Sequence, residues 1–146
     1  MSEKKNIAIV RRLFDEVFTG GNISLLDTII DSNVKLHDPS SSQFQGGLKG
    51  FKQREEVYAY AFPSKTLVID ELFSSGDTVA VRWNATGTHE RELPGIPATG
   101  KDITITGTSI FLLKGGKVVE IYQNWDELGM LSQLGAYSTS AYAGQR

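Results

Sequence analysis

The sequence predicts an α+β fold in which N-terminal helices pack on one face of a curved antiparallel sheet and enclose a hydrophobic pocket. Two observations lead to this prediction. Apolar residues recur at helical spacing as far as residue 62, and from Thr66 onward the period becomes two, which is typical of strands. The length of 146 residues suits one domain with its own core, so we expect a single domain over 1–146 with a loose tail over 136–146.

The first predicted helix carries its apolar residues three, four and seven positions apart, which places them on one helix face. These residues are Ile7, Val10, Phe14, Val17 and Phe18. The run Thr19-Gly20-Gly21 should end this helix, and Asn22 should cap a second, short helix that reaches Ile30.

Prolines mark the next two boundaries. An extended piece over residues 34–37 should end at Asp38, because the residue before a proline is pushed away from the helical region. Residues 40–47 are polar and predict a loop. Residues 48–62 predict a third helix, which Pro63 ends.

Four strands are predicted in the second half of the chain, over residues 66–73, 78–89, 102–113 and 117–125. The Gly-Gly pair between the last two strands is a strong signal for a two-residue hairpin turn. A segment rich in proline and glycine separates the second strand from the third and predicts a loop. After the last strand, Asp126 is expected to cap a short closing helix.

Alternation along the strands predicts which side chains point inward. The inner residues expected near a ligand are Trp83, His89, Ser109, Phe111, Val119, Ile121, Gln123 and Trp125. This face is apolar apart from Ser109, Gln123, the His89 ring and the indole N–H groups, which suits an apolar pocket with a few orienting hydrogen bonds. It equally suits a core in which the polar groups are paired with the backbone, and both interpretations stay open.

Composition excludes several classes of function. Fifteen Lys and Arg oppose seventeen Asp and Glu, so we expect no nucleic-acid partner and no acidic membrane surface. No apolar stretch approaches the roughly 18–20 residues that span a bilayer, and no signal-peptide core is recognisable, so we expect a cytoplasmic protein. The chain has no cysteine, which excludes thiolate chemistry, and no spacing among its histidines and acids enforces a metal site.

Several motifs follow one another in an order that resembles a known family. The more specific ones are Gly95-Ile96-Pro97-Ala98-Thr99-Gly100 and the ending Gln133-Leu134-Gly135, and weaker ones are Val10-Arg11-Arg12-Leu13-Phe14, His37-Asp38-Pro39 and Gly116-Lys117-Val118-Val119-Glu120. Together they cover about residues 7–135 and resemble the SnoaL-like polyketide cyclase (ester cyclase) family. That resemblance implies the nuclear-transport-factor-2-like fold, a cone of helices over a curved antiparallel sheet.

The resemblance also implies an activity, the closure of a ring by intramolecular aldol condensation on a polyketide ester, without metal or organic cofactor. Family members use an aspartate on the last strand as acid–base catalyst, supported by a histidine on the neighbouring strand. When the chain is aligned on its Gly-Lys hairpin and its Gln-Leu-Gly ending, these positions hold Gln123 and Ser109. An amide cannot take a proton from a carbon acid near neutral pH, so the same chemistry would need another base.

Two interpretations of function therefore compete. The protein is either a cofactor-independent cyclase or isomerase that enolises a compact apolar carbonyl compound, with His89 or Asp126 as base, or a non-catalytic binding module for an apolar metabolite. In both, the expected ligand-binding residues are His37, Trp83, Ser109, Phe111, Ile121, Gln123 and Trp125, and neither a metal nor a cofactor is expected. For Asp126 the structural alternative is the helix cap, and for Asp38 it is a turn cap beside a half-exposed His37.

The outward-facing residues of the predicted sheet are rich in threonine and amide side chains and only lightly charged. They are Arg82, Asn84, Thr104, Thr106, Thr108, Glu120, Tyr122 and Asn124. Such a flat face can pair with its own copy through a two-fold axis. We therefore expect a homodimer, or a homotetramer built from one. A third interpretation of function is that this self-association is itself the protein's purpose.

Overall fold

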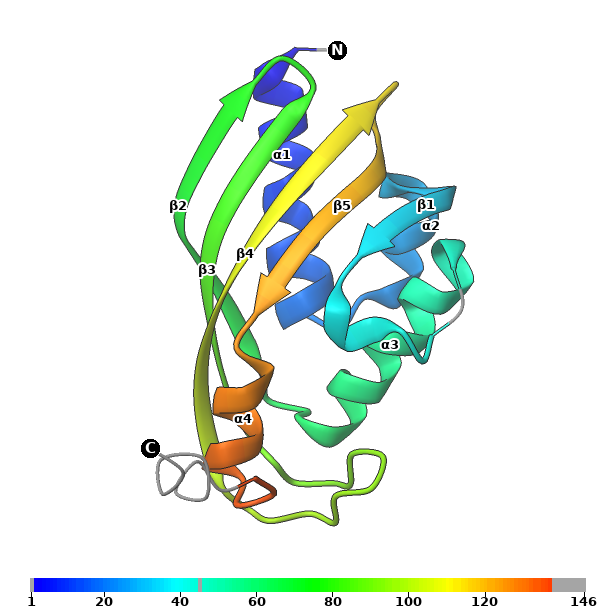
Figure 1. Cartoon of the computed structure of the whole chain (residues 1–146). Coiled ribbons are helices and arrows are strands. Elements are labelled where there is room, and N and C mark those ends of the chain that lie inside the picture. Colours follow the sequence, from blue (N-terminus) through cyan, green and yellow to red (C-terminus); the bar gives the residue numbers. More distant parts are fainter. Residues whose placement is uncertain (1, 45, 138–146) are drawn as a thin grey trace.

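A five-stranded sheet with the order β1-β5-β4-β3-β2 organises the chain (Figure 1). The computed structural model describes residues 2–44 and 46–137. Its strands are β1 (Ile30–His37), β2 (Thr66–Ser75), β3 (Thr78–Thr88), β4 (Asp102–Lys114) and β5 (Lys117–Trp125). The predicted α+β class is confirmed, and strands β2 to β5 pair antiparallel as expected. Strand β1 begins four residues earlier than predicted and adds a parallel edge to β5.

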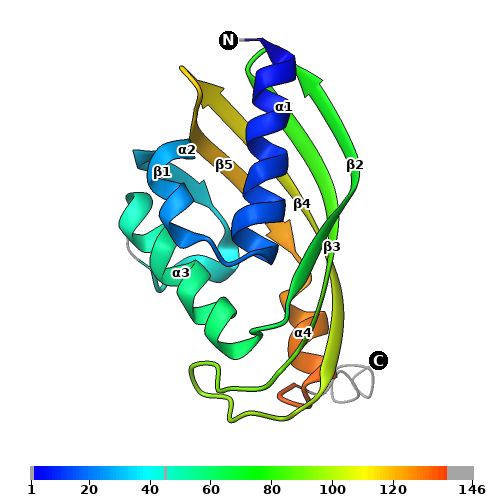
Figure 2. The ribbon, with the colours of Figure 1, turned by 180° about the vertical axis from the view of Figure 1, so that it is seen from behind.

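The helices cover one face of this sheet, as Figure 2 shows from behind. Helix α1 (Glu3–Arg12) continues into the π-helical turn η1 (Leu13–Thr19), and α3 (Gly47–Ala61) lies across the lower part of the same layer. The shorter elements are η2 (Ile23–Leu25), α2 (Leu26–Ile29), η3 (Pro39–Ser41) and α4 (Glu127–Gln133). Within the described residues, no helix is long and apolar enough to cross a membrane.

The predicted helix ends are largely confirmed. The first helical run ends at Gly20 and Gly21, and Gly21 has a φ of 75°, which glycine adopts without the steric cost that a side chain brings. Asp126 caps α4 as expected, since its carboxylate accepts a hydrogen bond from the backbone of Gly129. Asn22 is a correction: its side chain accepts the hydroxyl proton of Ser24 and caps no backbone N–H.

Strand alternation places the predicted side chains inside along β3 and β4, where Trp83 and Ser109 are buried. In β5 one residue differs from the prediction. A bulge opposite Leu112 and Leu113 shifts the register, so Val118 is fully buried and Val119 only half-buried. Beyond the bulge, Gln123 faces inward as expected.

The hydrophobic core lies between α1, η1 and the inner face of the sheet. Phe14 sits at its centre, with its ring edge-on to Phe18 at 5.1 Å and to Phe111 at 6.1 Å between centroids. Aromatic pairs in this arrangement contribute beyond their buried area. The tail that was expected to be loose lies, from residue 138 onward, outside the described residues.

Candidate functional site

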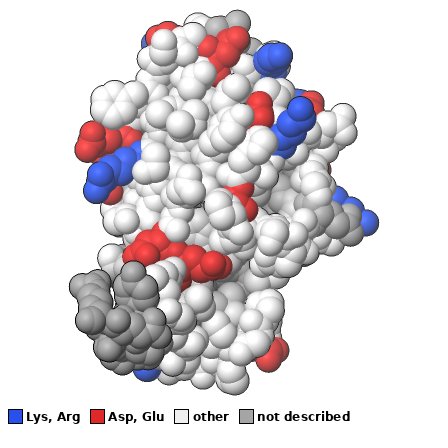
Figure 3. All heavy atoms as spheres, in the orientation of Figure 1, with Lys and Arg blue, Asp and Glu red and all other residues white. Residues whose placement is uncertain are grey.

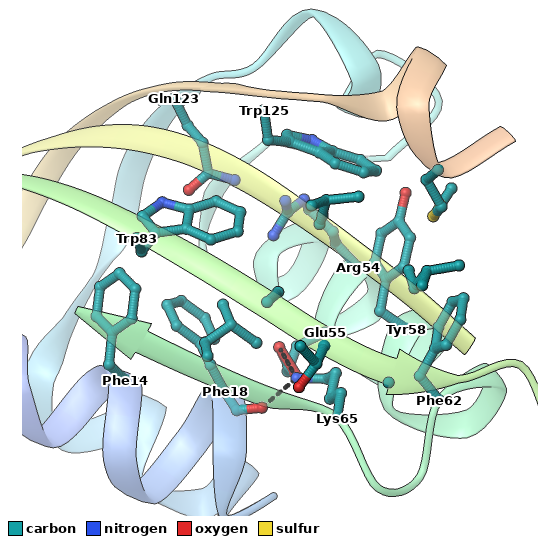
Figure 4. A pocket seen from close by; sticks show the side chains of 17 residues that line it. Phe14, Phe18, Arg54, Glu55, Tyr58, Phe62, Lys65, Trp83, Gln123 and Trp125 are labelled. Carbon is teal, nitrogen blue, oxygen red and sulfur yellow. Dashed lines mark hydrogen bonds and ion pairs between the residues drawn. The ribbon is translucent and has the colours of Figure 1, made fainter. Parts of the chain in front are cut away.

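A cavity lies between helix α3, the end of η1 and the inner face of β3, β4 and β5 (Figure 4). The space that admits water-sized molecules is about 80 Å³. Its wall is mainly aromatic and aliphatic, and its polar side chains come from α3, from Lys65 just before β2, from Thr86 of β3 and from β5. The aromatic lining residues are Phe14, Phe18, Tyr58, Phe62, Trp83 and Trp125, and the charged or amide ones are Arg54, Glu55, Lys65 and Gln123.

Trp83 reaches its place because the neighbouring strand carries a glycine opposite it. Gly107 pairs with Trp83 across β3 and β4. A Cβ atom at position 107 would lie 2.1 Å from Cζ2 of the indole, so any larger residue would displace the ring. The glycine in mid-strand therefore serves close packing between the two strands.

A directional chain of hydrogen bonds runs from Trp83 across the inner face of the sheet. The Trp83 Nε1–H donates to Ser109 Oγ at 3.0 Å, and the Ser109 hydroxyl donates to Gln123 Oε1 at 2.9 Å. Gln123 Nε2 then donates to Asp38 Oδ2 at 3.1 Å. An indole N–H can only donate, so it fixes the direction of every later bond and the orientation of the Gln123 amide.

Asp38 is the acceptor at which this chain ends. Its side chain is only 1% exposed and pairs with Arg54 Nη2 at 3.2 Å. Its other oxygen accepts from the Ser40 backbone N–H at 2.9 Å and from the Ser40 hydroxyl at 2.7 Å. With Gln123 these make four hydrogen bonds, which fill the acceptor sites of a carboxylate. Trp125 joins through Ser40, whose Oγ accepts the indole N–H at 2.7 Å. We name these seven residues, Asp38, Ser40, Arg54, Trp83, Ser109, Gln123 and Trp125, the Asp38 cluster.

A second polar feature of the cavity is the ion pair between Glu55 of α3 and Lys65, just before β2. Lys65 Nζ lies 2.9 Å from Glu55 Oε2 and 3.3 Å from Oε1, and it also donates to the backbone carbonyl of Phe18. The two side chains are 13% and 4% exposed, Lys65 first. Burial raises the pKa of the Glu55 carboxyl above its ordinary 4.5, and the nearby charges of Lys65 and Arg54 oppose that rise only in part.

Three of the residues that the sequence predicted to bind a ligand line the cavity: Trp83, Gln123 and Trp125. Ser109 lies directly behind them and is fully buried, joined to both Trp83 and Gln123. The structure does not bring the other apolar candidates to the cavity. Phe111 and Ile121 are 0% and 1% exposed and belong to the core beneath α1, farther along their strands.

The two predicted bases occupy other places. His89 is fully buried, its Nδ1 accepts from the backbone of Thr99 at 3.2 Å, and its ring packs on Phe62, which lines the cavity. The loop after β3 folds back over this histidine. The His89 backbone N–H donates to the Lys101 carbonyl, and the Gly100 N–H donates to the His89 carbonyl. The Asp126 carboxylate is used by the N-cap bond to Gly129 at 2.9 Å. Neither residue lines the cavity.

His37 also lies elsewhere than predicted. Its ring faces the outer side of the sheet, where Nε2 lies 2.6 Å from Glu120 Oε2 and the ring stacks on Tyr122 at 4.3 Å. The cause is the parallel pairing of β1 with β5, which sets His37 beside Tyr122 on the outer face. The carboxylate of Glu120 has its pKa lowered by the hydrogen bond to His37.

Sequence reasoning missed the charged residues on helix α3. Arg54 and Glu55 follow Phe51 by three and four positions and precede Tyr58, so the helical period that placed Phe51 and Tyr58 inside also places them inside. That period was the available signal. For Asp38 the sequence signalled only the turn cap. Nothing in it indicated the burial of its carboxylate. Among the described residues, no group of three or more His, Cys, Asp or Glu side chains is placed to hold a metal ion.

A curved sheet with helices on one face and an apolar cavity between them defines a class of small α+β domains. Within that class, the sequence profile of the SnoaL-like polyketide cyclases matches residues 8–134. The chain therefore belongs to the SnoaL-like polyketide cyclase family, within the nuclear-transport-factor-2-like superfamily. Among curated proteins, none matches this chain.

Solved structures agree with this assignment. A candidate polyketide cyclase from Acidithiobacillus ferrooxidans is 33% identical with a TM-score of 0.81, over 94% of this chain and all (100%) of the other. IdmH from Streptomyces antibioticus, also a candidate polyketide cyclase, is 26% identical with a TM-score of 0.77, over 89% and 98%. TsrD from Streptomyces laurentii is 22% identical with a TM-score of 0.83, over 94% and 99%, and shows the shared fold.

Proposed function

We propose that the chain is a cytoplasmic, cofactor-independent cyclase or isomerase that moves a proton at the α-carbon of a compact apolar carbonyl compound. The observation that carries this proposal is the cavity itself. It combines an aromatic wall with a buried carboxylate and a buried ammonium group. Apolar walls with a few placed polar groups are typical of ligand sites, and titratable groups in such sites are typical of catalysis.

The size of the cavity supports a compact ligand. The space of about 80 Å³ is smaller than the cavity of about 150 Å³ that takes up benzene in an engineered apolar core. Even a one-ring ketone therefore requires a small outward movement of the lining side chains, which limits the ligand to compact compounds. A ligand with several rings would require side chains such as Tyr58 and Trp125, which are only partly buried, to move outward.

A second function, binding without catalysis, is favoured by the Asp38 cluster. Gln123 and Ser109 stand at the family's acid–base positions. Both side chains are already hydrogen-bonded within the protein, Ser109 to Gln123 and Gln123 to Asp38. The side of the wall that these paired groups form can shape a binding site without transferring a proton.

Proton exchange and binding measured on the same samples separate the two functions. Cyclopentanone and cyclohexanone serve as probes because both have a single ring and exchangeable α-protons. Binding is followed by quenching of Trp83 and Trp125 fluorescence and by a rise in melting temperature. Saturation at 100 times the dissociation constant would stabilise the fold by about 2.7 kcal/mol. If α-deuteration in D₂O is faster with the protein than in buffer alone, the enzyme is supported. Binding without such deuteration supports the binding module. If the protein gives neither binding nor deuteration, both functions are overturned.

The outer face of the sheet supports a further part of the proposal, a homodimer or a homotetramer built from it. Most of the face in Figure 3 carries no charge, and its charged side chains lie mainly along the edges and in an acidic band below the middle. Ile110 and Tyr122 are 38% and 46% exposed there. Light scattering at tens of micromolar should give at least twice the monomer mass. Thr106→Arg should dissociate the assembly, Glu56→Arg on α3 should not, and a monomeric native protein would refute it.

A further inference from the structure

We propose that Glu55 is the catalytic base of this cavity and that Lys65 is the electrophile that stabilises the enolate oxygen. This inference rests on the proposed proton-transfer function and names the residues that carry it. It places the acid–base chemistry on helix α3, across the cavity from the strand position where Gln123 stands.

Figure 4 shows the geometry that leads to this assignment. Gln123 and Trp125 stand on one side of the cavity, and Glu55 with Lys65 stands on the other, beside Phe18. A ligand held between the indoles and Phe18 would therefore have the carboxylate and the ammonium group at one end. Both groups reach the cavity from elements that pack firmly: α3 lies against β1, and Lys65 immediately precedes β2.

Two carboxylates, Asp38 and Glu55, lie in or beside the cavity, and their hydrogen bonds show which of them is available as a base. Asp38 already accepts four hydrogen bonds, so a proton or a substrate would have to displace a donor. Glu55 has one partner among the described residues, Lys65. Its carboxylate keeps free acceptor sites, and burial raises its pKa in the direction that a base for a carbon acid requires.

Lys65 can hold both its partners and still bind an oxygen. An ammonium group has three N–H donors. One bond goes to the Phe18 carbonyl and one to Glu55 Oε1, which leaves a third donor for a substrate oxygen. The remaining charge near the pair is Arg54, which faces Asp38 and Ser41.

The step balances without any further reactant. The Glu55 carboxylate takes the α-proton, so a C–H bond breaks and an O–H bond forms. The electron pair of that C–H bond forms the C=C bond of the enolate, and the carbonyl π pair moves to oxygen, where the Lys65 ammonium group stabilises it. Glu55 then returns its proton to carbon in an isomerisation, or to the new alkoxide when the enolate carbon attacks a second carbonyl group. A positioned donor at a developing oxyanion is worth about 10²–10³-fold in rate.

A purely structural role predicts a different outcome. The pair ties α3 to the end of η1 through Phe18 and to the start of β2 through Lys65. In that role, replacing Glu55 would change stability but leave the exchange rate of the folded protein unchanged. The test must therefore measure exchange and folding separately.

The experiment compares native protein with Glu55→Gln, Glu55→Asp and Glu56→Gln in D₂O, using cyclopentanone and cyclohexanone and following α-deuteration by NMR. Glu56 is the matched control, because it is the next residue on α3 and is exposed. We expect Glu55→Gln to lower the exchange rate by about 10²–10⁴-fold, Glu55→Asp by less, and Glu56→Gln not at all. The native rate should rise with pH through the raised pKa of Glu55, because only the ionised carboxylate accepts a proton.

The outcomes are distinguishable. If Glu55→Gln does not fold, the double variant Glu55→Met/Lys65→Met, which removes both charges together, tests the pair as a unit and should bind ketone without exchanging it. Lys65→Met alone, which keeps Glu55, should then retain a pH-dependent exchange that the double variant lacks. Native exchange that survives in the folded Glu55 variants overturns this inference and leaves the proposed function standing. Native protein that exchanges neither ketone overturns the proposed function and this assignment together. Lys65→Met should raise the pH midpoint of exchange, since it removes a charge that favours the ionised carboxylate.

Discussion

The Asp38 cluster and the Glu55–Lys65 pair are two buried polar groups that border one cavity, and they are built in opposite ways. In the Asp38 cluster the carboxylate accepts four hydrogen bonds, and both indoles and the Ser109 hydroxyl donate to a neighbour. In the other group one carboxylate meets one ammonium group, with a single backbone carbonyl beside them. The first arrangement connects β1, η3, α3, β3, β4 and β5, whereas the second connects only α3, η1 and the start of β2.

This difference predicts that one group mainly stabilises the fold and that the other can take part in proton transfer. A saturated network fixes its members in one geometry, and its loss leaves buried groups without partners. A carboxylate with free acceptor sites and a raised pKa can exchange a proton without breaking other contacts. We therefore expect changes in the Asp38 cluster to act on the free energy of unfolding, and changes in the Glu55–Lys65 pair to act on proton transfer.

Arg54→Met should give the largest loss of stability. The variant leaves the buried Asp38 carboxylate without its only cation within the described residues. Removing one partner of a buried pair costs about 3–5 kcal/mol in the free energy of unfolding. Urea unfolding measures this loss as a lower midpoint concentration, provided that the dependence of the unfolding free energy on urea concentration stays unchanged.

A matched control for Arg54→Met lies on the same helix. Lys52 pairs with Asp27, but the two side chains are 29% and 59% exposed. Exposed pairs contribute about 0–1 kcal/mol, so Lys52→Met should change little. Equal losses in the two variants would contradict the contrast between the buried cluster and the surface.

Gln123→Glu should give the next largest effect, with a strong pH dependence. The new carboxylate replaces the amide that donates to Asp38 Oδ2 at 3.1 Å, so two acids meet. One of them must hold a proton, and its pKa rises in the folded state. Keeping a carboxyl with an ordinary pKa of about 4.3 protonated at pH 7 costs about 3–4 kcal/mol, which is the upper limit of the expected loss.

The sign follows from linkage. A pKa raised by folding contributes stability that is present at low pH and lost as the pH rises through the folded value. The melting temperature of Gln123→Glu should therefore approach the native one near pH 4 and fall away toward pH 8. Gln123→Met carries no titrating group, so its melting temperature should lie below the native one by the same amount at every pH. A deficit of Gln123→Glu that does not change with pH would mean that positions 38 and 123 do not meet.

Ser109→Ala tests one link inside the Asp38 cluster. It leaves the Trp83 N–H and Gln123 Oε1 without partners in a buried place. An unpaired buried polar group costs about 1–3 kcal/mol, and we expect a loss in that range by urea unfolding. Ser74→Ala is the control, because the buried Ser74 hydroxyl makes no hydrogen bond within the described residues. A loss for Ser74→Ala as large as that for Ser109→Ala would argue against the network.

Much of this architecture is predictable because local patterns decide it. The Gly115-Gly116 turn has both φ angles positive, at 57° and 81°, which glycine allows at low cost and which closes the β4–β5 hairpin as expected. The cap at Asp126 and the alternation that buries Trp83, Ser109 and Gln123 depend equally on short-range rules. Each of these features is specified within a few residues of sequence.

The parts that were missed depend on contacts between distant segments. The bulge that exchanges Val118 for Val119 is a property of the β4–β5 pairing and leaves no mark in the alternation of one strand. Likewise, His37 points outward because β1 pairs parallel to β5. Asp38 meets Gln123 across 85 positions of sequence, and no local pattern anticipates such a pair.

Removing the Glu55–Lys65 pair as a whole should have the smallest effect on stability. Replacing a buried ion pair by well-packed hydrophobic residues of similar volume is often neutral or stabilising, by up to about 4 kcal/mol. We therefore expect Glu55→Met/Lys65→Met to unfold at a urea concentration equal to or above the native one. The raised pKa of Glu55 adds a pH dependence: its contribution is present below 4.5 and lost as the pH rises through the folded value, so the advantage of the double variant should grow over that interval. Urea midpoints between pH 4 and 8 measure this. A double variant that loses as much stability as Arg54→Met would show that both polar groups hold the fold, and the separation between a structural cluster and a chemical pair would fail.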